Sequence, residues 1–254
     1  MVGGAASVLS SRRALALVIL LAALVVYGAV AEDLAELGSR SDLAVVSLLV
    51  LPAFMSAVWL ALPLAEIRRP HLLIAVAGLA ALAWVAFDVT GADSAANVAK
   101  FSAFGLAGIW FVTLFEELWW VTLVAVLIPW MDLWSVAFGP TRYVVEEQPG
   151  FFEQISVAFA VPGEAGSVNL GPPDVIFFAL FLATAARFQL RVGWTWLAMT
   201  GFLALTLVLV WEWDVFGLPA LPAVCLGLLV PNADVLWSNA REAWQGRRNA
   251  TPAG

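Results

Sequence analysis

Long apolar runs recur along this chain, and they limit its possible folds more than any other feature. A helix needs about 20 residues to cross the hydrocarbon layer of a bilayer, because each residue adds about 1.5 Å. Of the 254 residues, 63% are hydrophobic and only 12% are charged, whereas a soluble domain carries roughly a quarter charged residues. The mean hydropathy of +0.94 agrees with this contrast. The sequence therefore predicts membrane-spanning helices.

Windows of about 19 residues predict an all-α, polytopic membrane protein with about eight transmembrane helices. The expected spans are 14–31, 43–64, 72–87, 101–115, 118–138, 175–187, 194–210 and 218–236. We expect two groups of membrane helices, residues 1–115 and residues 116–254, and the second group includes a long, partly amphipathic connection at 139–173. The first span resembles a secretory signal, but its apolar stretch is long for one, so we expect a retained helix.

Several common chemistries lack their residues in this chain. Cys225 and His71 are each the only residue of their type, so no thiolate cluster or histidine metal site is expected, and we expect neither a metal nor another cofactor. No glycine-rich nucleotide loop and no zinc-protease motif is present. The arginines form no basic stripe, so nucleic acid is not an expected partner.

Two aspartates stand out because they lie at membrane depth. A carboxylate at the centre of a bilayer costs at least about 2.5 to 3.5 kcal/mol, so it persists mainly where it faces a polar cavity or another polar group. Asp132 lies inside the span 118–138, and Asp174 immediately precedes the span 175–187. Consecutive spans run in opposite directions, so the two side chains can meet at a similar depth.

Two close carboxylates in a low dielectric share one proton, because both cannot ionise easily. In aspartic proteolysis the ionised carboxylate takes a proton from water while the protonated one supports the peptide carbonyl. A proton or cation relay in a transporter and a polar contact between helices are alternatives. The two aspartates alone do not choose among these.

Three short motifs resemble the presenilin and signal peptide peptidase family of intramembrane aspartyl proteases. Residues 131–146 (MDLWSVAFGPTRYVVE) are similar to the family's first catalytic helix and the Gly-Pro-x-Arg segment after it. Residues 168–178 are similar to its Gly-x-Gly-Asp motif, and 218–222 match its Pro-Ala-Leu motif. The resemblance covers about residues 109–236. It implies a presenilin-like bundle, although family members usually have nine helices. It also implies that Asp132 and Asp174 are the catalytic pair and that transmembrane helices of other proteins are the substrates.

The resemblance also implies which residues shape the site. They are Gly171, Pro172, Pro173, Pro219, Ala220, Leu221 and Pro222. Pro173 is a departure, because it stands where the motif has its second glycine. Proline fixes φ and removes an N–H, but it is well tolerated at the first helical position, so a helix is expected to start here.

The segment 219–222 can be interpreted without the family. Two prolines in four residues cannot continue a regular helix, and irregular backbone at membrane depth must line a cavity or be covered by protein. Its main-chain groups could pair with an extended substrate strand. The alternative is a simple helix start with proline in the first turn.

A protein of the same fold without proteolytic activity is the competing hypothesis, either an inactive helix-binding relative or a proton-coupled transporter. A transporter typically carries inverted internal repeats, and none is visible in this sequence. The sequence gives no sign of an oligomeric state.

The basic residues predict the orientation in what we expect to be a prokaryotic plasma membrane. Placing both termini in the cytoplasm follows the positive-inside rule. The residues inside are then Arg12, Arg13, Arg68, Arg69, Arg187, Arg191, Arg241, Arg247 and Arg248, and those outside are Arg40, Lys100 and Arg142. This orientation resembles signal peptide peptidase and is opposite to presenilin, so we expect substrates whose N-terminus is cytoplasmic.

Reporter fusions test this orientation. A periplasm-active enzyme fused after Gly150 should be active, because 139–173 lies outside the cytoplasm, and the same enzyme fused after Gly254 should be silent. The reverse pattern of activities would overturn both the topology and the inferred substrate polarity.

Overall fold

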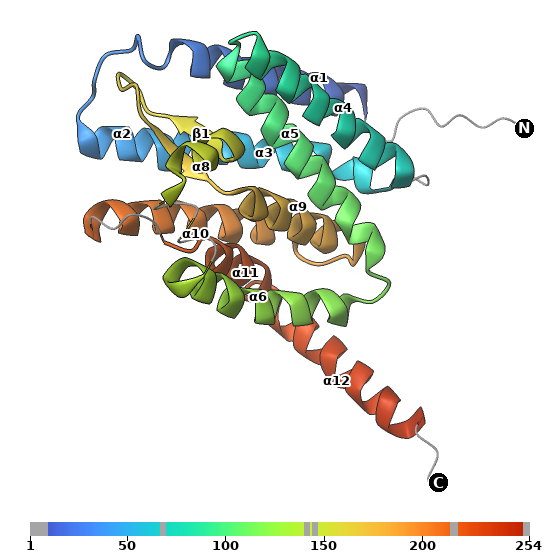
Figure 1. Cartoon of the computed structure of the whole chain (residues 1–254). Helices are drawn as coiled ribbons and strands as arrows, with labels where there is room; N and C mark the ends of the chain where they lie inside the picture. Colours follow the sequence, from blue (N-terminus) through green and yellow to red (C-terminus); the bar gives the residue numbers. More distant parts are fainter. Residues whose placement is uncertain (1–9, 67–69, 140–142, 144–146, 214–217, 251–254) are drawn as a thin grey trace, which may run out of the picture.

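The computed structural model describes residues 10–66, 70–139, 143, 147–213 and 218–250 of the chain (Figure 1). Within these residues, six helical segments are long and apolar enough to cross a membrane, and one bent pair of helices raises the number to seven. The six are α1 (Ser11–Val30), the segment Ser39–Glu66, α4 (Pro70–Val89), the segment Asp93–Leu114, α6 (Leu118–Phe138) and α10 (Val192–Trp213). The chain is therefore an integral membrane protein built as an all-helical bundle.

Each expected span falls largely on helix, but two of the eight do not form a single full-length span. The expected span 175–187 is α9 (Pro172–Arg187), whose 16 residues are short for a crossing. The expected span 218–236 divides into α11 (Leu221–Leu229) and the start of α12 (Ala233–Ala250), and the axes of these helices differ by 82°. The expected count of eight is therefore not confirmed.

Two spans are composite helices. Ser39–Glu66 consists of α2 (Ser39–Val45), the π-helical turn η1 (Val46–Val50), α3 (Leu51–Ala61) and the 3-10 turn η2 (Leu62–Glu66). Pro52 in the first turn of α3 has no N–H to give to the preceding turn, so a change of helical pitch just before it is expected.

The span predicted at 101–115 begins earlier in the structure. It consists of α5 (Asp93–Phe111) and the 3-10 turn η3 (Val112–Leu114). Lys100 lies inside α5 rather than at its end, and its side chain is buried. Its ammonium donates to the Gln154 carbonyl at 2.8 Å and lies 5.5 Å from the Trp84 ring. These contacts satisfy a charge that the sequence suggested would lie in water.

The connection 139–173 contains a β-hairpin that the sequence did not predict. After the short helix α8 (Pro149–Ile155), strands β1 (Val157–Ala160) and β2 (Ser167–Leu170) pair antiparallel, with Val157 opposite Leu170. Gly163 adopts a positive φ of 72° in the turn between them. Phe159 of β1 stacks edge-on against Phe54 at 5.0 Å, which anchors the hairpin to α3.

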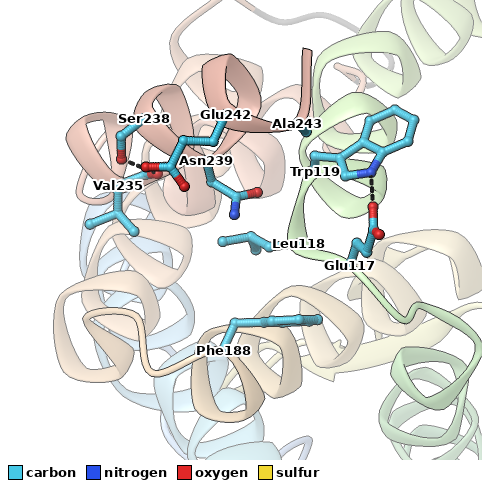
Figure 2. Close-up of a pocket in the computed structure, with 9 residues that line it drawn as sticks. All are labelled: Glu117, Leu118, Trp119, Phe188, Val235, Ser238, Asn239, Glu242 and Ala243. Carbon is cyan, nitrogen blue, oxygen red and sulfur yellow. Dashed lines mark hydrogen bonds between the residues drawn. The ribbon is translucent and has the colours of Figure 1, made fainter. Parts of the chain in front are cut away.

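The bend between α11 and α12 is held by Arg191, which lies between α9 and α10. Its main-chain N–H donates to Asn232 Oδ1, and its guanidinium donates to the Pro231 carbonyl and to both carboxylate oxygens of Asp234. Beyond the bend α12 packs against the beginning of α6. Side chains from the two helices line a pocket there (Figure 2).

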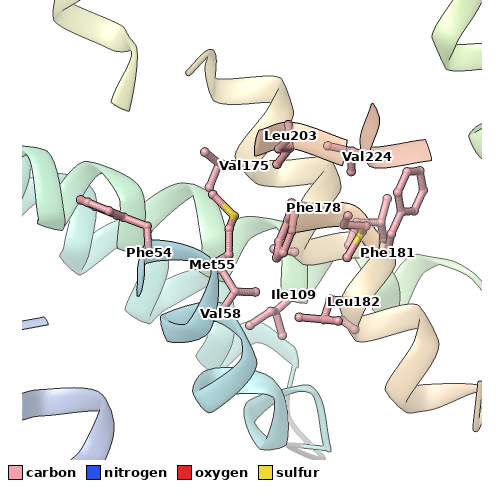
Figure 3. Packing of buried hydrophobic residues seen from close by; sticks show 14 of the residues in the cluster. Phe54, Met55, Val58, Ile109, Val175, Phe178, Phe181, Leu182, Leu203 and Val224 are labelled. Atoms are coloured by element: carbon pink, nitrogen blue, oxygen red, sulfur yellow. The ribbon is translucent and has the colours of Figure 1, made fainter. Parts of the chain in front are cut away.

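Helix α9 lies at the centre of the bundle. It contacts α5, α10 and α11, and most of its side chains are fully buried. Figure 3 shows Phe178 and Phe181 of α9 among aliphatic side chains of the surrounding helices, including Met55, Ile109 and Val224. Because α9 is surrounded by protein rather than lipid, it need not have the length of a membrane-spanning helix.

Close contact between α5 and α9 depends on Gly108. A Cβ atom at this position would lie 2.7 Å from the Cβ of Ala179 and would overlap the Ile176 carbonyl. We expect Gly108→Ala to push the two helices apart and to lower the free energy of unfolding by about 1 to 3 kcal/mol. Thermal unfolding in detergent, followed by circular dichroism, measures the effect.

Gly201→Ala is the matched control. A Cβ there meets nothing within 4 Å, so alanine should leave stability unchanged or raise it through its helix propensity. Equal stability of the two variants would contradict the close α5–α9 contact.

Candidate active site

Asp132 lies on α6 and reaches across to the beginning of α11. Its half-buried carboxylate accepts a hydrogen bond from the main-chain N–H of Leu221, with 3.2 Å between nitrogen and oxygen. Leu221 is the first residue of α11, so this N–H has no partner within its own helix. Asp132 thus caps a helix that lies 89 residues further along the chain.

Asp174 lies in the first turn of α9, which begins at Pro172. The expected helix start at these prolines is therefore confirmed, and Pro173 occupies a position where proline is tolerated. Gly171 is the N-cap of α9, and a Cβ there would lie 3.1 Å from Asp174 Oδ2. Glycine at this position leaves room for the carboxylate.

The structure brings Asp132 and Asp174 into one neighbourhood. Their helices contact each other, and both contact α11. The charge on Asp132 acts on Asp174, and both carboxylates act on the thiol of Cys225 in α11. Two carboxylates from separate helices thus act on each other, and such proximity disfavours ionisation of both at once.

Cys225 has a position that its sequence context did not reveal. It is fully buried. It also follows Leu221 by four residues, which places both on the same face of α11. This face points toward the two aspartates.

The segment 218–222 combines both interpretations drawn from its sequence. Residues 218–220 are not helical, and α11 starts at Leu221 with Pro222 in its first turn. The Ala220 carbonyl already accepts from the N–H groups of Ala223 and Val224, and the Leu221 N–H donates to Asp132. These two main-chain groups are therefore not open to an extended strand.

The hairpin before Asp174 has two edges that differ in how their main-chain groups are satisfied. Asn97 of α5 donates to the Ala158 carbonyl at 2.7 Å and accepts from the Ala158 N–H at 2.8 Å. The Tyr27 hydroxyl donates to the Ala160 carbonyl at 2.9 Å. Side chains therefore close the outer edge of β1.

The outer edge of β2 is open. The N–H and C=O of Ala158 both form hydrogen bonds with the Asn97 side chain, so they point away from β2. Ala158 and its antiparallel partner Asn169 therefore form a pair without inter-strand hydrogen bonds. The N–H and C=O of Asn169 consequently point away from β1, and they have no hydrogen-bond partner among the described residues. This free edge ends four residues before Asp174.

Sequence reasoning missed the side chains that brace the hairpin. Asn97 and Lys100 are polar residues within an otherwise apolar segment, and such residues normally face the interior of a membrane bundle. That signal could have extended the expected helix to include them. The partners of Asn97 were not readable, because β1 was not recognised as a strand.

Within the described residues, no group of three His, Cys, Asp or Glu side chains lies close enough to hold a metal ion. Comparison with known protein families, with curated proteins and with solved structures finds no match for this chain. Function is therefore inferred from the residues of the site and their arrangement.

Proposed function

We propose that this protein is an intramembrane aspartyl protease, similar to the presenilin and signal peptide peptidase family, with Asp132 and Asp174 as its catalytic pair. The observation that supports the proposal is that these two carboxylates lie close enough to act on each other, beside a non-helical segment. Asp132 lies 14 residues from one end of α6 and six from the other, or about 20 Å and about 9 Å. The substrates are transmembrane segments of other proteins.

The reaction requires one carboxylate ionised and the other protonated. The ionised group takes a proton from a water molecule as the water oxygen attacks the peptide carbonyl carbon, and the protonated group gives its proton to the carbonyl oxygen. The resulting gem-diol then breaks its C–N bond: the carboxyl that took the water proton gives it to the nitrogen, and the other carboxylate takes a proton from a diol hydroxyl. The products are one carboxylic acid and one amine, with one water consumed.

A transmembrane helix must lose its own hydrogen bonds before a peptide bond inside it can be attacked. Unpaired main-chain groups are costly in lipid, so the unwound segment needs new partners. The open edge of β2 supplies an N–H and a C=O at Asn169, close to Asp174 along the chain. Addition of the unwound segment as a third strand would give hydrogen-bond partners to the main-chain groups of both the segment and β2.

A structural role for Asp132 supports the competing hypothesis of a protein without protease activity. A carboxylate that caps α11 could serve only to hold that helix in place. Asparagine at position 132 separates the two roles, because its amide oxygen can still accept the Leu221 N–H but cannot take part in proton exchange.

The catalytic pair is tested with Asp132→Asn and Asp174→Asn in purified protein reconstituted with a membrane-embedded reporter. Each change should lower the cleavage rate by about a hundredfold or more, because neither carboxylate can perform both proton transfers. The double variant should be no slower than either single one. Asp88→Asn, at the exposed end of α4, is the control and should keep full activity. Normal cleavage by a folded Asp132→Asn protein would show that Asp132 serves only as a helix cap.

The strand edge is tested with Asn169→Pro and Asn169→Ala. Proline removes the outward N–H of the edge but leaves the ladder to β1 intact, because Asn169 and Ala158 share no inter-strand hydrogen bond. We expect the proline variant to lose cleavage of the membrane-embedded reporter and the alanine variant, which keeps the N–H, to retain it. Equal activities of the two folded variants would show that substrates do not pair at β2.

A further inference from the structure

Helix α12 differs from the helices that cross the membrane. It meets α11 at 82°, so it runs almost perpendicular to a helix of the bundle and extends away from it (Figure 1). Trp237 and Trp244 are exposed on its surface. An amphipathic helix with exposed tryptophans is typical of the boundary between lipid and water.

A pocket of about 600 Å³ lies between α12 and the beginning of α6. Glu117, just before α6, lines one wall, and Asn239 and Glu242 line the opposite wall from α12 (Figure 2). Phe188, from the turn after α9, forms part of the floor in this view. The pocket is therefore acidic at its rim, and it lies at the end of the bundle where α12 leaves it.

Two carboxylates line this pocket without a cation to balance them. Of the described residues, none forms an ion pair with Glu117 or Glu242. Among the described residues, Glu117 accepts a hydrogen bond only from the indole N–H of Trp119. A primary ammonium fits this arrangement, because it carries one positive charge and three N–H donors.

A second, apolar pocket of about 530 Å³ adjoins the first, and Trp119 and Ala243 line both. Leu123 and Val126 of α6 and Leu236 of α12 line its interior. Arg241 stacks over Trp237, another lining residue, at 4.8 Å, so a guanidinium lies beside this pocket. The two pockets together present an acidic end, an apolar end and a cation beside the apolar end.

We propose that these two neighbouring pockets bind one phospholipid whose headgroup carries a primary ammonium, as in phosphatidylethanolamine. The ammonium donates to Glu117 and Glu242, the phosphate lies near Arg241, and an acyl chain occupies the apolar pocket. A choline headgroup has no N–H to donate, and a glycerol headgroup leaves a net negative lipid facing two carboxylates. This assignment does not depend on the proposed protease activity.

Lipid binding by the full-length protein in detergent, measured by native mass spectrometry, tests the proposal. Phosphatidylethanolamine, phosphatidylcholine and phosphatidylglycerol with the same acyl chains are titrated separately. We expect phosphatidylethanolamine to bind most tightly. Glu117→Gln and Glu242→Gln should each weaken it by about tenfold, because each removes a charge-assisted hydrogen bond. Glu212→Gln, at the opposite end of α10 from Arg191, is the control and should leave binding unchanged.

Thermal unfolding provides a second measurement that does not depend on the detection of lipid adducts. Phosphatidylethanolamine should raise the unfolding temperature of the unchanged protein and of Glu212→Gln, and it should raise those of the Glu117 and Glu242 variants less. Unfolding without added lipid shows whether each variant is folded. Equal affinity for all three lipids, or equal phosphatidylethanolamine binding by unchanged protein and folded Glu117→Gln, would overturn the proposal.

Discussion

Lipid offers no hydrogen-bond partners, so polar groups at membrane depth must find them within the protein. Much of this bundle is arranged by that requirement. Where α11 begins, the free N–H of Leu221 finds the carboxylate of Asp132. Where a strand edge meets the helices, Asn97 and Tyr27 supply the missing donors and acceptors. Lys100 is accommodated in the same way by the Gln154 carbonyl.

The same requirement explains how the short helix α9 can carry Asp174. A helix that faced lipid would need the full thickness of the hydrocarbon layer, but α9 is enclosed by α5, α10 and α11. Gly108 permits the close approach of α5. Enclosure also brings the first turn of α9, with the carboxylate of Asp174, to the interior of the bundle. The two aspartates can therefore meet away from lipid.

The sequence revealed the parts of this structure that have strong local signals. Runs of apolar residues predicted the helices, and prolines 172 and 173 predicted the start of α9. The hairpin was missed because its two strands have four residues each, too few for a clear alternation of apolar and polar side chains. The break after Leu229 was missed because the apolar run continues to Val230 before the turn at Pro231 and Asn232. The start of α5 was placed too late because a lysine was taken as a boundary, although its partner lies 54 residues away.

The amide of Asn97 acts toward β1 as a neighbouring strand would, and this has a consequence for self-association. A two-stranded sheet normally has two open edges, and repeated pairing at both can build an endless fibre. Here one edge is closed by a side chain, so only β2 can accept a partner. If the β2 strands of two copies met, their pairing would close on itself around a twofold axis. The hairpin can therefore add a single strand but cannot start a polymer.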